Sequence, residues 1–267
     1  MPTLRPEVAD RSLEEFPPAV PEAGEVHLWW VDLGRSDAGR LAPALGPEEV
    51  VAAHNFRRPR DRDRYIVAHG ALRSILGRYL GRRPAGLEFR YGPSGKPALR
   101  DGRLRFNLAH AHDLAVCAVA RAEVGVDLER AHGQADPEWL AAVYPSAGRA
   151  LTAFPRAERP AAFFRAWTRM EACVKAAGTT VELGLARLET FLECDASGRS
   201  YPLLQGTYWH CYDLTPSAEY VGAVAGSEEM IMRFTWWAGP GDERLGVPGP
   251  VRASDLRHPA GPRGAVQ

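Results

Sequence analysis

Lysine is almost absent from this chain of 267 residues. Of its 33 basic residues only Lys96 and Lys175 are lysine, so the other 31 are arginine. A genome with a strong base bias explains most of the arginine, but it does not explain where the two lysines stand. Lysine offers a compact point charge, whereas arginine offers a planar fork. Both lysines lie in segments whose other residues are suited to binding phosphate.

Long apolar runs and an excess of one charge are missing as well. No stretch reaches the roughly 18 apolar residues that indicate a transmembrane helix, and 33 acidic residues balance the 33 basic ones. Residues 1–10 contain Glu7 and Asp10 and no apolar core, unlike a secretory signal. We therefore expect a cytosolic protein whose partners include neither a membrane nor a nucleic acid.

Cysteine is scarce, and its four positions show no C-x-x-C pairing. Cys117, Cys173 and Cys211 stand among apolar or aromatic residues, which indicates buried reduced thiols rather than disulfides or metal ligands. No pair of histidines has the helical spacing of H-E-x-x-H, so a zinc site is not expected. The content of 45% hydrophobic and 25% charged residues is that of an ordinary globular protein.

The periodicity divides the chain into a folded body and two tails. Residues 1–24 and 238–267 are rich in Pro, Gly, Arg and Glu without an apolar period, which predicts a flexible lead-in and a disordered tail. For the body we expect an α+β fold of two pseudo-symmetric subdomains, residues 25–122 and 123–237. Each is expected to be a helix packed on a small antiparallel sheet.

A weak internal duplication supports this division. Each half is predicted to contain an amphipathic helix, at 64–80 and 161–177, with a glycine directly past its end. A strand at 26–33 precedes the first helix. The strands expected after the helices are 87–91, 104–108 and 114–120 in the first half, and 188–194, 207–213 and 220–225 in the second. The turns 94–96 and 197–199 occupy matching places, and two related halves place an active site in the cleft between them.

Two carboxylates share one face of a predicted strand at 125–129. Alternation directs Asp127 and Glu129 to one side and Val126 and Leu128 to the core. Adjacent carboxylates repel each other, and a bound cation relieves that repulsion. Oxygen ligands favour Mg²⁺. A solvated strand face produces the same pattern more often, so the pair alone is weak evidence.

A third acidic residue lies on the second predicted helix. Phe164, Trp167, Glu171 and Lys175 fall along one stripe of that helix. Glu171 and Lys175 are spaced i, i+4, which an exposed ion pair would also explain. That interpretation has to account in addition for the tryptophan on the same stripe and for one of the two lysines.

Lys96 stands in a Gly-Pro-Ser-Gly-Lys-Pro turn, which is either an ordinary turn or a loop that presents an ammonium to phosphate. It is not a Walker A loop, because the required glycine spacing and the Lys-Ser/Thr pair are absent. His110 ends a predicted strand in a polar cluster, where a single histidine is more often structural than catalytic.

Four segments, taken in order, carry a resemblance. They are 94–97 (Ser-Gly-Lys-Pro), 106–110 (Phe-Asn-Leu-Ala-His), 125–129 (Gly-Val-Asp-Leu-Glu) and 167–175 (Trp-Thr-Arg-Met-Glu-Ala-Cys-Val-Lys). Together they resemble the 4′-phosphopantetheinyl transferase superfamily, in its larger surfactin-synthetase-activating class, over about residues 26–225. In that class one chain holds two pseudo-symmetric subdomains.

The resemblance implies transfer of the phosphopantetheine arm of coenzyme A to a serine of an acyl or peptidyl carrier protein, with release of 3′,5′-ADP. By position, Asp127, Glu129 and Glu171 would hold Mg²⁺, with Mn²⁺ as an alternative. Glu171 would also act as the base and Lys175 would stabilise pyrophosphate charge. The positions implied to bind the nucleotide and its phosphates are Arg64, Lys96, His110 and Lys175, with His110 counted among the catalytic residues too. The duplication predicts a monomer.

Two departures from the family pattern leave other interpretations open. Met170 stands where the family has a lysine before the glutamate, and Ala109 stands where it commonly has a serine before the histidine. Arg169 is adjacent to Met170 but points about 100° away on a helix. The alternatives to an active transferase are a family member that binds coenzyme A or a carrier protein without catalysis, and another Mg²⁺-dependent phosphohydrolase.

Overall fold

The computed structural model describes residues 19–131, 145–195, 199–237 and 239. Most of the predicted lead-in at 1–24 and of the predicted tail at 238–267 lies outside these residues, and so do residues 197 and 198 of the predicted turn at 197–199.

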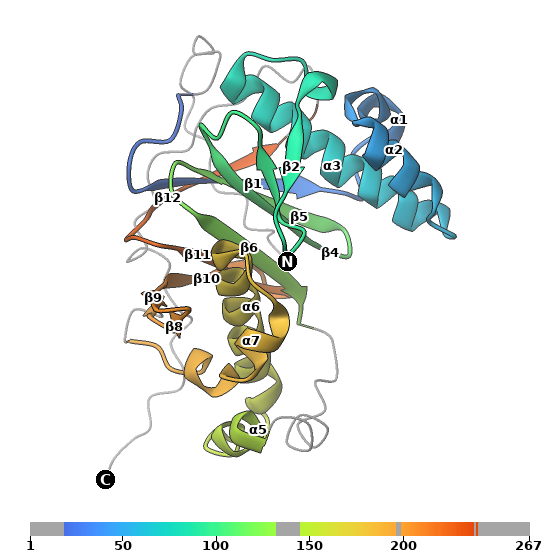
Figure 1. Cartoon of the computed structure of the whole chain (residues 1–267). Helices are drawn as coiled ribbons and strands as arrows, with labels where there is room; N and C mark the ends of the chain where they lie inside the picture. Colours follow the sequence, from blue (N-terminus) through green and yellow to red (C-terminus); the bar gives the residue numbers. More distant parts are fainter. Residues whose placement is uncertain (1–18, 132–144, 196–198, 238, 240–267) are drawn as a thin grey trace, which may run out of the picture.

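The described chain forms four layers, in which two sheets pack face to face between two long helices (Figure 1). The first sheet has the strand order β12-β1-β5-β4 and the second β6-β11-β10-β7. The strands of the first sheet are β1 (Glu25–Asp32), β4 (Arg105–Ala111), β5 (Leu114–Ala120) and β12 (Ile231–Trp237). Those of the second are β6 (Val124–Arg130), β7 (Arg199–Ser200), β10 (His210–Ser217) and β11 (Tyr220–Gly226). Two small hairpins are added by β2 (Phe89–Tyr91) with β3 (Pro97–Leu99), and by β8 (Leu203–Leu204) with β9 (Thr207–Tyr208).

Helix α3 covers the first sheet and helix α6 covers the second. The α-helices are α1 (Ala38–Leu41), α2 (Pro47–His54), α3 (Pro59–Leu80), α5 (Pro145–Leu151), α6 (Arg159–Ala177) and α7 (Val181–Leu185). The 3₁₀-helices are η1 (Ala42–Ala44), η2 (Pro84–Gly86) and η3 (Leu188–Phe191). None of the helices formed by the described residues combines enough length with enough apolarity to cross a bilayer.

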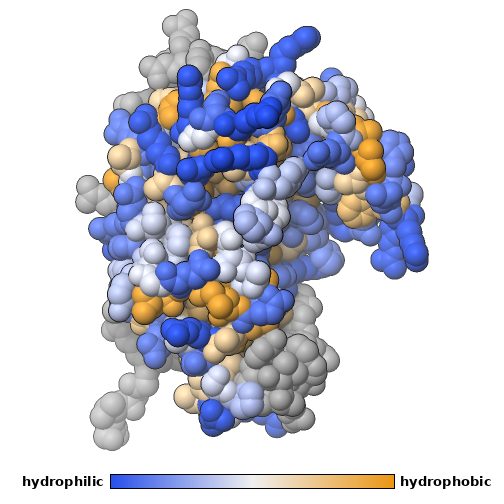
Figure 2. Space-filling view, viewed as in Figure 1, coloured by the Kyte–Doolittle hydropathy of each residue, from blue (hydrophilic) through white to orange (hydrophobic). Residues whose placement is uncertain are grey.

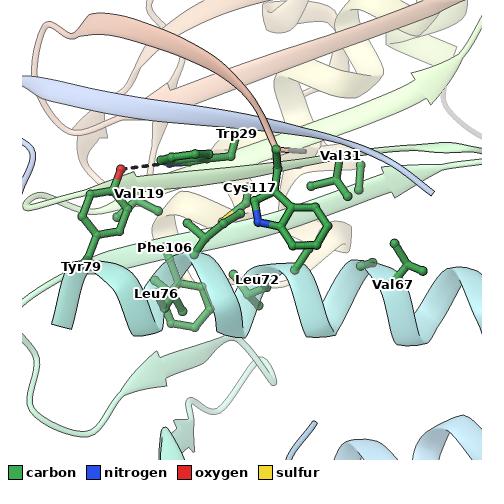
Figure 3. Close-up of a cluster of buried hydrophobic side chains, with 14 of the residues drawn as sticks. Trp29, Val31, Val67, Leu72, Leu76, Tyr79, Phe106, Cys117 and Val119 are labelled. Atoms are coloured by element: carbon green, nitrogen blue, oxygen red, sulfur yellow. Dashed lines mark hydrogen bonds between the residues drawn. The ribbon is translucent and has the colours of Figure 1, made fainter. Parts of the chain in front are cut away.

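The layers follow from the alternation of side chains along the strands. On β1, Trp29 and Val31 point to α3, where they join a buried cluster with residues such as Leu72 and Tyr79 (Figure 3). Leu28, on the other face of β1, lies in the apolar layer between the two sheets. Both faces of β1 are thus buried, which accounts for its nearly continuous run of apolar residues.

The two halves repeat one arrangement, and the predicted α+β fold class is confirmed. Strand β5 pairs with β1 and β4 as β11 pairs with β6 and β10. Helices α3 and α6 each end at a left-handed glycine, Gly81 and Gly178, with φ of 61° and 62°. The first sheet also contains one strand that the sequence did not predict, because β12 returns from the second half and pairs in parallel with β1. The subdomain boundaries remain a prediction.

Two predicted strands differ in the structure. The strand expected at 188–194 is wrong, because residues 188–191 form the 3₁₀-helix η3. Its buried residues Leu188 and Phe191 are three positions apart, which matches the period of a 3₁₀-helix rather than the alternation of a strand. The strand expected at 207–213 is divided, since β9 pairs with β8 and β10 begins at His210. The predicted burial of Cys117, Cys173 and Cys211 is confirmed.

The surface of the molecule is mixed in character. Figure 2 shows a largely hydrophilic face over the first half and a group of apolar side chains, interrupted by hydrophilic ones, lower down over the second half. Large apolar side chains exposed in the second half are Leu183, Tyr201, Leu203, Tyr208, Ile231 and Trp236. The first four come from α7 and from the region of β8 and β9, and the last two come from β12 at the edge of the first sheet.

Candidate active site

Gly125 brings strand β6 into direct contact with helix α6. A Cβ atom added at Gly125 would lie 2.1 Å from the Ala172 carbonyl oxygen and 2.4 Å from the Ala176 backbone nitrogen. Only a residue without a Cβ atom lets the two backbones approach so closely. Because β6 and α6 carry the predicted acidic residues, this contact sets the distance between those residues.

Asp127, Glu171 and Lys175 meet where β6 and α6 are held together. The Lys175 ammonium donates to Asp127 Oδ1 at 2.5 Å and lies 3.8 Å from Glu171 Oε2. Asp127 is 5% exposed, and the Lys175 side chain is 30% exposed. The i, i+4 pair expected on the helix is therefore present, but it belongs to a partly buried cluster that spans the helix and the strand.

Glu129 belongs to the same electrostatic cluster. Burial, followed by the charge of Asp127, raises the pKa of Glu129, and the same two causes raise the pKa of Glu171 against the opposing charge of Lys175. Burial also raises the pKa of Asp127, although Lys175 opposes it. The Trp167 indole N–H lies near enough to the Glu129 carboxylate to lower its pKa in part. One lysine does not offset three carboxylates, so the cluster favours additional positive charge.

The fit of these residues to a divalent cation depends on how their oxygen atoms are already bonded. Within the ranges that the structure describes, no group of three or more His, Cys, Asp or Glu side chains is already arranged to hold a metal ion. Asp127 and Glu171 turn to the Lys175 ammonium instead. However, Asp127 Oδ2 is buried without a hydrogen-bond partner, which is costly for a carboxylate oxygen. This orphaned oxygen and the hard donor set fit Mg²⁺, and the ligand triad with Glu129 stays a prediction.

A basic rim from the first half lies beside Lys175. The side chain of His110 is exposed at the end of β4. Surrounding protein, followed by the positive charges of His69, Lys175 and Arg64, lowers the pKa of His110. The Arg64 guanidinium binds Asp113 at 2.7 and 2.9 Å. Cations from α3 and α6 thus converge on one histidine, an arrangement that favours an anionic ligand.

Lys96 is placed differently from the other predicted phosphate ligands. Its ammonium donates to the Glu123 carboxylate at 3.0 Å and to the carbonyls of Val124 and Ala176 at 3.1 and 3.2 Å. These contacts put Lys96 at the C-terminal end of α6, bonded to protein acceptors. Its contact with a phosphate stays a prediction.

Two further residues shape the site and received no role from the sequence. Asn107 lies buried in β4, and its Oδ1 accepts a hydrogen bond from the Val126 backbone at 2.8 Å, which ties the two sheets together. Asp113, at the tip of the hairpin between β4 and β5, holds both Arg60 and Arg64. Asn107 could have been noticed as a polar residue inside an otherwise apolar strand. Nothing in the sequence indicates that Asp113 binds Arg64, which lies 49 residues away.

Comparison with known proteins assigns the family. Residues 123–225 match the model of the 4′-phosphopantetheinyl transferase superfamily. The chain is 37% identical over 221 residues to the 4′-phosphopantetheinyl transferase HetI of Nostoc sp., an alignment that covers 79% of this chain and 90% of the relative. The chain belongs to the 4′-phosphopantetheinyl transferase superfamily. Its similarity to a 4′-phosphopantetheinyl transferase of Bacillus subtilis is 25% identity over 166 residues, covering 61% and 73% of the two chains. Its similarity to AcpT of Escherichia coli K12 is 35% over 121 residues, covering 44% and 58%.

The family match agrees with the position of the cluster. The matched residues of this transferase run from the start of β6 to the end of β11 and include α6. Asp127, Glu129, Glu171 and Lys175 all lie inside the matched range. Arg64, Lys96 and His110 precede it. The first half brings Arg64 and His110 near Lys175, whereas Lys96 lies at the end of α6.

Both departures from the family pattern are buried in the transferase. Met170 is fully buried, and its Sδ atom would be 2.5 Å from a Cβ atom on Gly184 of α7. Arg169 is buried too and binds Asp213 at 2.6 and 2.7 Å. It therefore does not replace the missing lysine at the site. Ala109 points into the layer between the sheets, so a hydroxyl there would face apolar side chains.

Trp167 should contribute more to the site than to stability. Its side chain is half-buried, so Trp167→Ala should lower the free energy of unfolding by less than the roughly 3–5 kcal/mol of a fully buried tryptophan. Trp167→Phe keeps most of the packing and removes only the indole N–H that reaches Glu129. We expect Trp167→Phe to unfold in urea near the wild-type midpoint while the Glu129 pKa, followed by carboxyl NMR, rises further. An unchanged pKa would contradict the effect of the indole N–H on Glu129.

Proposed function

We propose that this chain transfers the 4′-phosphopantetheine arm of coenzyme A to a serine of an acyl or peptidyl carrier protein, depends on Mg²⁺, and releases 3′,5′-ADP. The observation that carries the proposal is the cluster of Asp127, Glu171 and Lys175 at the contact of β6 with α6. The family assignment supplies the reaction class. The cluster supplies a base, a cation and carboxylates in one place.

The residues proposed to hold the metal are Asp127, Glu129 and Glu171. When bound, the cation supplies charge for the phosphate oxygens of the coenzyme A diphosphate. The support is the orphaned oxygen of Asp127 and the raised pKa of each carboxyl group. The Trp167 indole N–H, which lowers the Glu129 pKa, is proposed to orient that carboxylate.

Glu171 is proposed as the base for the carrier serine, directly or through water. The serine oxygen forms a bond to the phosphorus next to the pantetheine arm, the bond from that phosphorus to the bridging oxygen breaks, and the serine proton passes to the Glu171 carboxylate. Burial and the nearby Asp127 raise the pKa of Glu171. A raised pKa makes the carboxylate a better proton acceptor near neutral pH.

The cations are proposed to bind the nucleotide. Lys175, released from Asp127, would offset the charge that develops on the leaving 3′,5′-ADP, because a point charge on a flexible stem follows a moving phosphate. His110 and Arg64 are proposed to bind phosphate on the rim. Arg64 has donors left over, since its contacts with Asp113 and Asp61 use three of its five N–H groups.

A transfer assay tests the proposal. The chain is incubated with coenzyme A, Mg²⁺ and several apo carrier proteins, and each carrier is weighed by mass spectrometry. We expect at least one carrier to gain the phosphopantetheine mass with Mg²⁺ and none to gain it after chelation. Binding of coenzyme A without transfer to any carrier would support a non-catalytic binder, and release of phosphate from nucleotides without a carrier would support a phosphohydrolase. We also propose that the chain acts as a monomer.

A further inference from the structure

All three donors of the Lys96 ammonium are used inside the protein. An ammonium has three N–H groups, and the side chain meets three oxygens, of Glu123, Val124 and Ala176, at 3.0–3.2 Å. The lysine side chain is 16% exposed. Burial lowers the Lys96 pKa, and the charge of Glu123 opposes this effect. No other lysine of the chain is bonded to two backbone carbonyls among the residues that the structure describes.

The two carbonyls belong to the two elements that build the acidic cluster. Val124 opens β6, three residues before Asp127, and Ala176 lies in the last turn of α6, directly after Lys175. One ammonium therefore ties the start of the strand to the end of the helix. The close backbone contact at Gly125 lies next to this tie, because Gly125 follows Val124 and its Cβ position lies against Ala176.

The end of α6 needs such a donor. The backbone N–H groups of Gly178 and Thr179 already satisfy the carbonyls of Lys175 and Val174, as in a Schellman cap. The Ala176 carbonyl is among the last four of the helix, which lack partners within it. The Lys96 ammonium donates to that carbonyl, and its positive charge suits the negative end of the helix dipole. The turn containing Lys96 also brings Ser94 Oγ to 4.0 Å from the Cβ position of Gly178.

We propose that Lys96 is a positioning residue, which holds the C-terminal end of α6 against the start of β6 and so fixes Lys175 and Glu171 relative to Asp127. The kinetic part of this inference rests on the proposed transferase function. A nucleotide phosphate would have to displace a carboxylate and two carbonyls from the ammonium to bind it. Arg64, on the rim, still has donors beyond those that bind Asp113 and Asp61.

The two roles of Lys96 predict opposite kinetic effects. A positioning residue affects the chemical step, since displacements of about 1 Å in a catalytic group lower rates by up to about a hundredfold. A phosphate ligand affects the binding of coenzyme A instead. Lys96→Met removes the charge and the donors and keeps most of the stem. We expect its kcat to fall about tenfold or more, with the KM and the Kd for coenzyme A changed by less than about twofold, and its Tm to fall.

Arg105→Met is the matched control. The Arg105 guanidinium also pairs with the Glu123 carboxylate, at 3.0 Å. Its removal takes one cation away from that carboxylate and leaves both carbonyl contacts of Lys96 intact. We expect this variant to keep kcat within about twofold of the wild type. All rates are measured at a temperature where every variant is folded by circular dichroism. A loss of kcat in Arg105→Met equal to that in Lys96→Met would assign the effect to Glu123 alone and overturn the proposal.

Two other results would overturn it. One is a Lys96→Met variant with raised KM and Kd for coenzyme A and unchanged kcat and Tm, which is the behaviour of a phosphate ligand. The other is a lower Tm with unchanged kcat, which is a purely structural contact. If the wild type itself transfers nothing, the proposed function fails, and the inference is judged on Tm and Kd. A lower Tm with unchanged Kd then supports the tie to α6, and the reverse contradicts it.

Discussion

Replacing Gly125 by alanine is expected to lower both the stability and the turnover of this protein more than any other change of one methyl group. The added Cβ atom would stand 2.1 Å from the Ala172 carbonyl oxygen and 2.4 Å from the Ala176 nitrogen. Both are backbone atoms of α6, so no side-chain rotation relieves the overlap. The helix has to move away from β6 by about 1 Å or more to restore ordinary contact.

The effects follow from that displacement. Overpacking of a core costs typically about 1–3 kcal/mol, and we expect Gly125→Ala at the upper end because two backbones are forced apart. A shift of about 1 Å between Glu171 and Asp127 should lower kcat by about a hundredfold. Urea unfolding and the transfer assay measure the two effects separately.

Gly86→Ala is the control for Gly125→Ala. Gly86 is exposed, and no atom lies within 4 Å of its Cβ position. We expect this variant to have wild-type stability and turnover. A Gly125→Ala protein that matches Gly86→Ala in both measurements would show that the contact between β6 and α6 is not what fixes the site.

Much of the site follows from local sequence patterns. Alternation along 125–129 placed Asp127 and Glu129 on one side and Leu128 in the core, and helical spacing placed Glu171 and Lys175 on one stripe. These are short-range consequences of backbone geometry. The structure adds what those patterns do not contain, namely that α6 covers this face of β6 at van der Waals contact.

Contacts between distant segments escaped prediction because nothing local encodes them. Strand β12 joins β1 across about two hundred residues, so no local pattern indicates this pairing. The strand predicted at 188–194 is wrong because the four residues that form η3 are too few to separate a period of two from a period of three. Lys96 has its partners 27, 28 and 80 residues away, so its turn suggested a phosphate loop.

Glu171→Gln is expected to abolish most turnover while leaving the fold as stable as before. Glutamine keeps the shape of the side chain and loses the proton-accepting carboxylate. General base catalysis contributes about 10²- to 10⁴-fold, and we expect kcat in the transfer assay to fall by an amount in this range. A Glu171→Gln enzyme with a near wild-type rate would remove this residue from the role of base.

The stability half of this prediction distinguishes a functional cluster from a structural one. A carboxyl group whose pKa is raised by folding weakens the folded state when it is ionised, at pH above its folded pKa, and this penalty disappears as the pH falls below its unfolded pKa. Burial raises the pKa of both Glu171 and Asp127. In metal-free buffer at about pH 8, Glu171→Gln and Asp127→Asn should therefore unfold in urea at the wild-type midpoint or above it. A clear loss of stability in both variants would mean that the ion pairs of Asp127 and Glu171 with Lys175 stabilise the wild-type fold. The cluster would then be structural rather than functional.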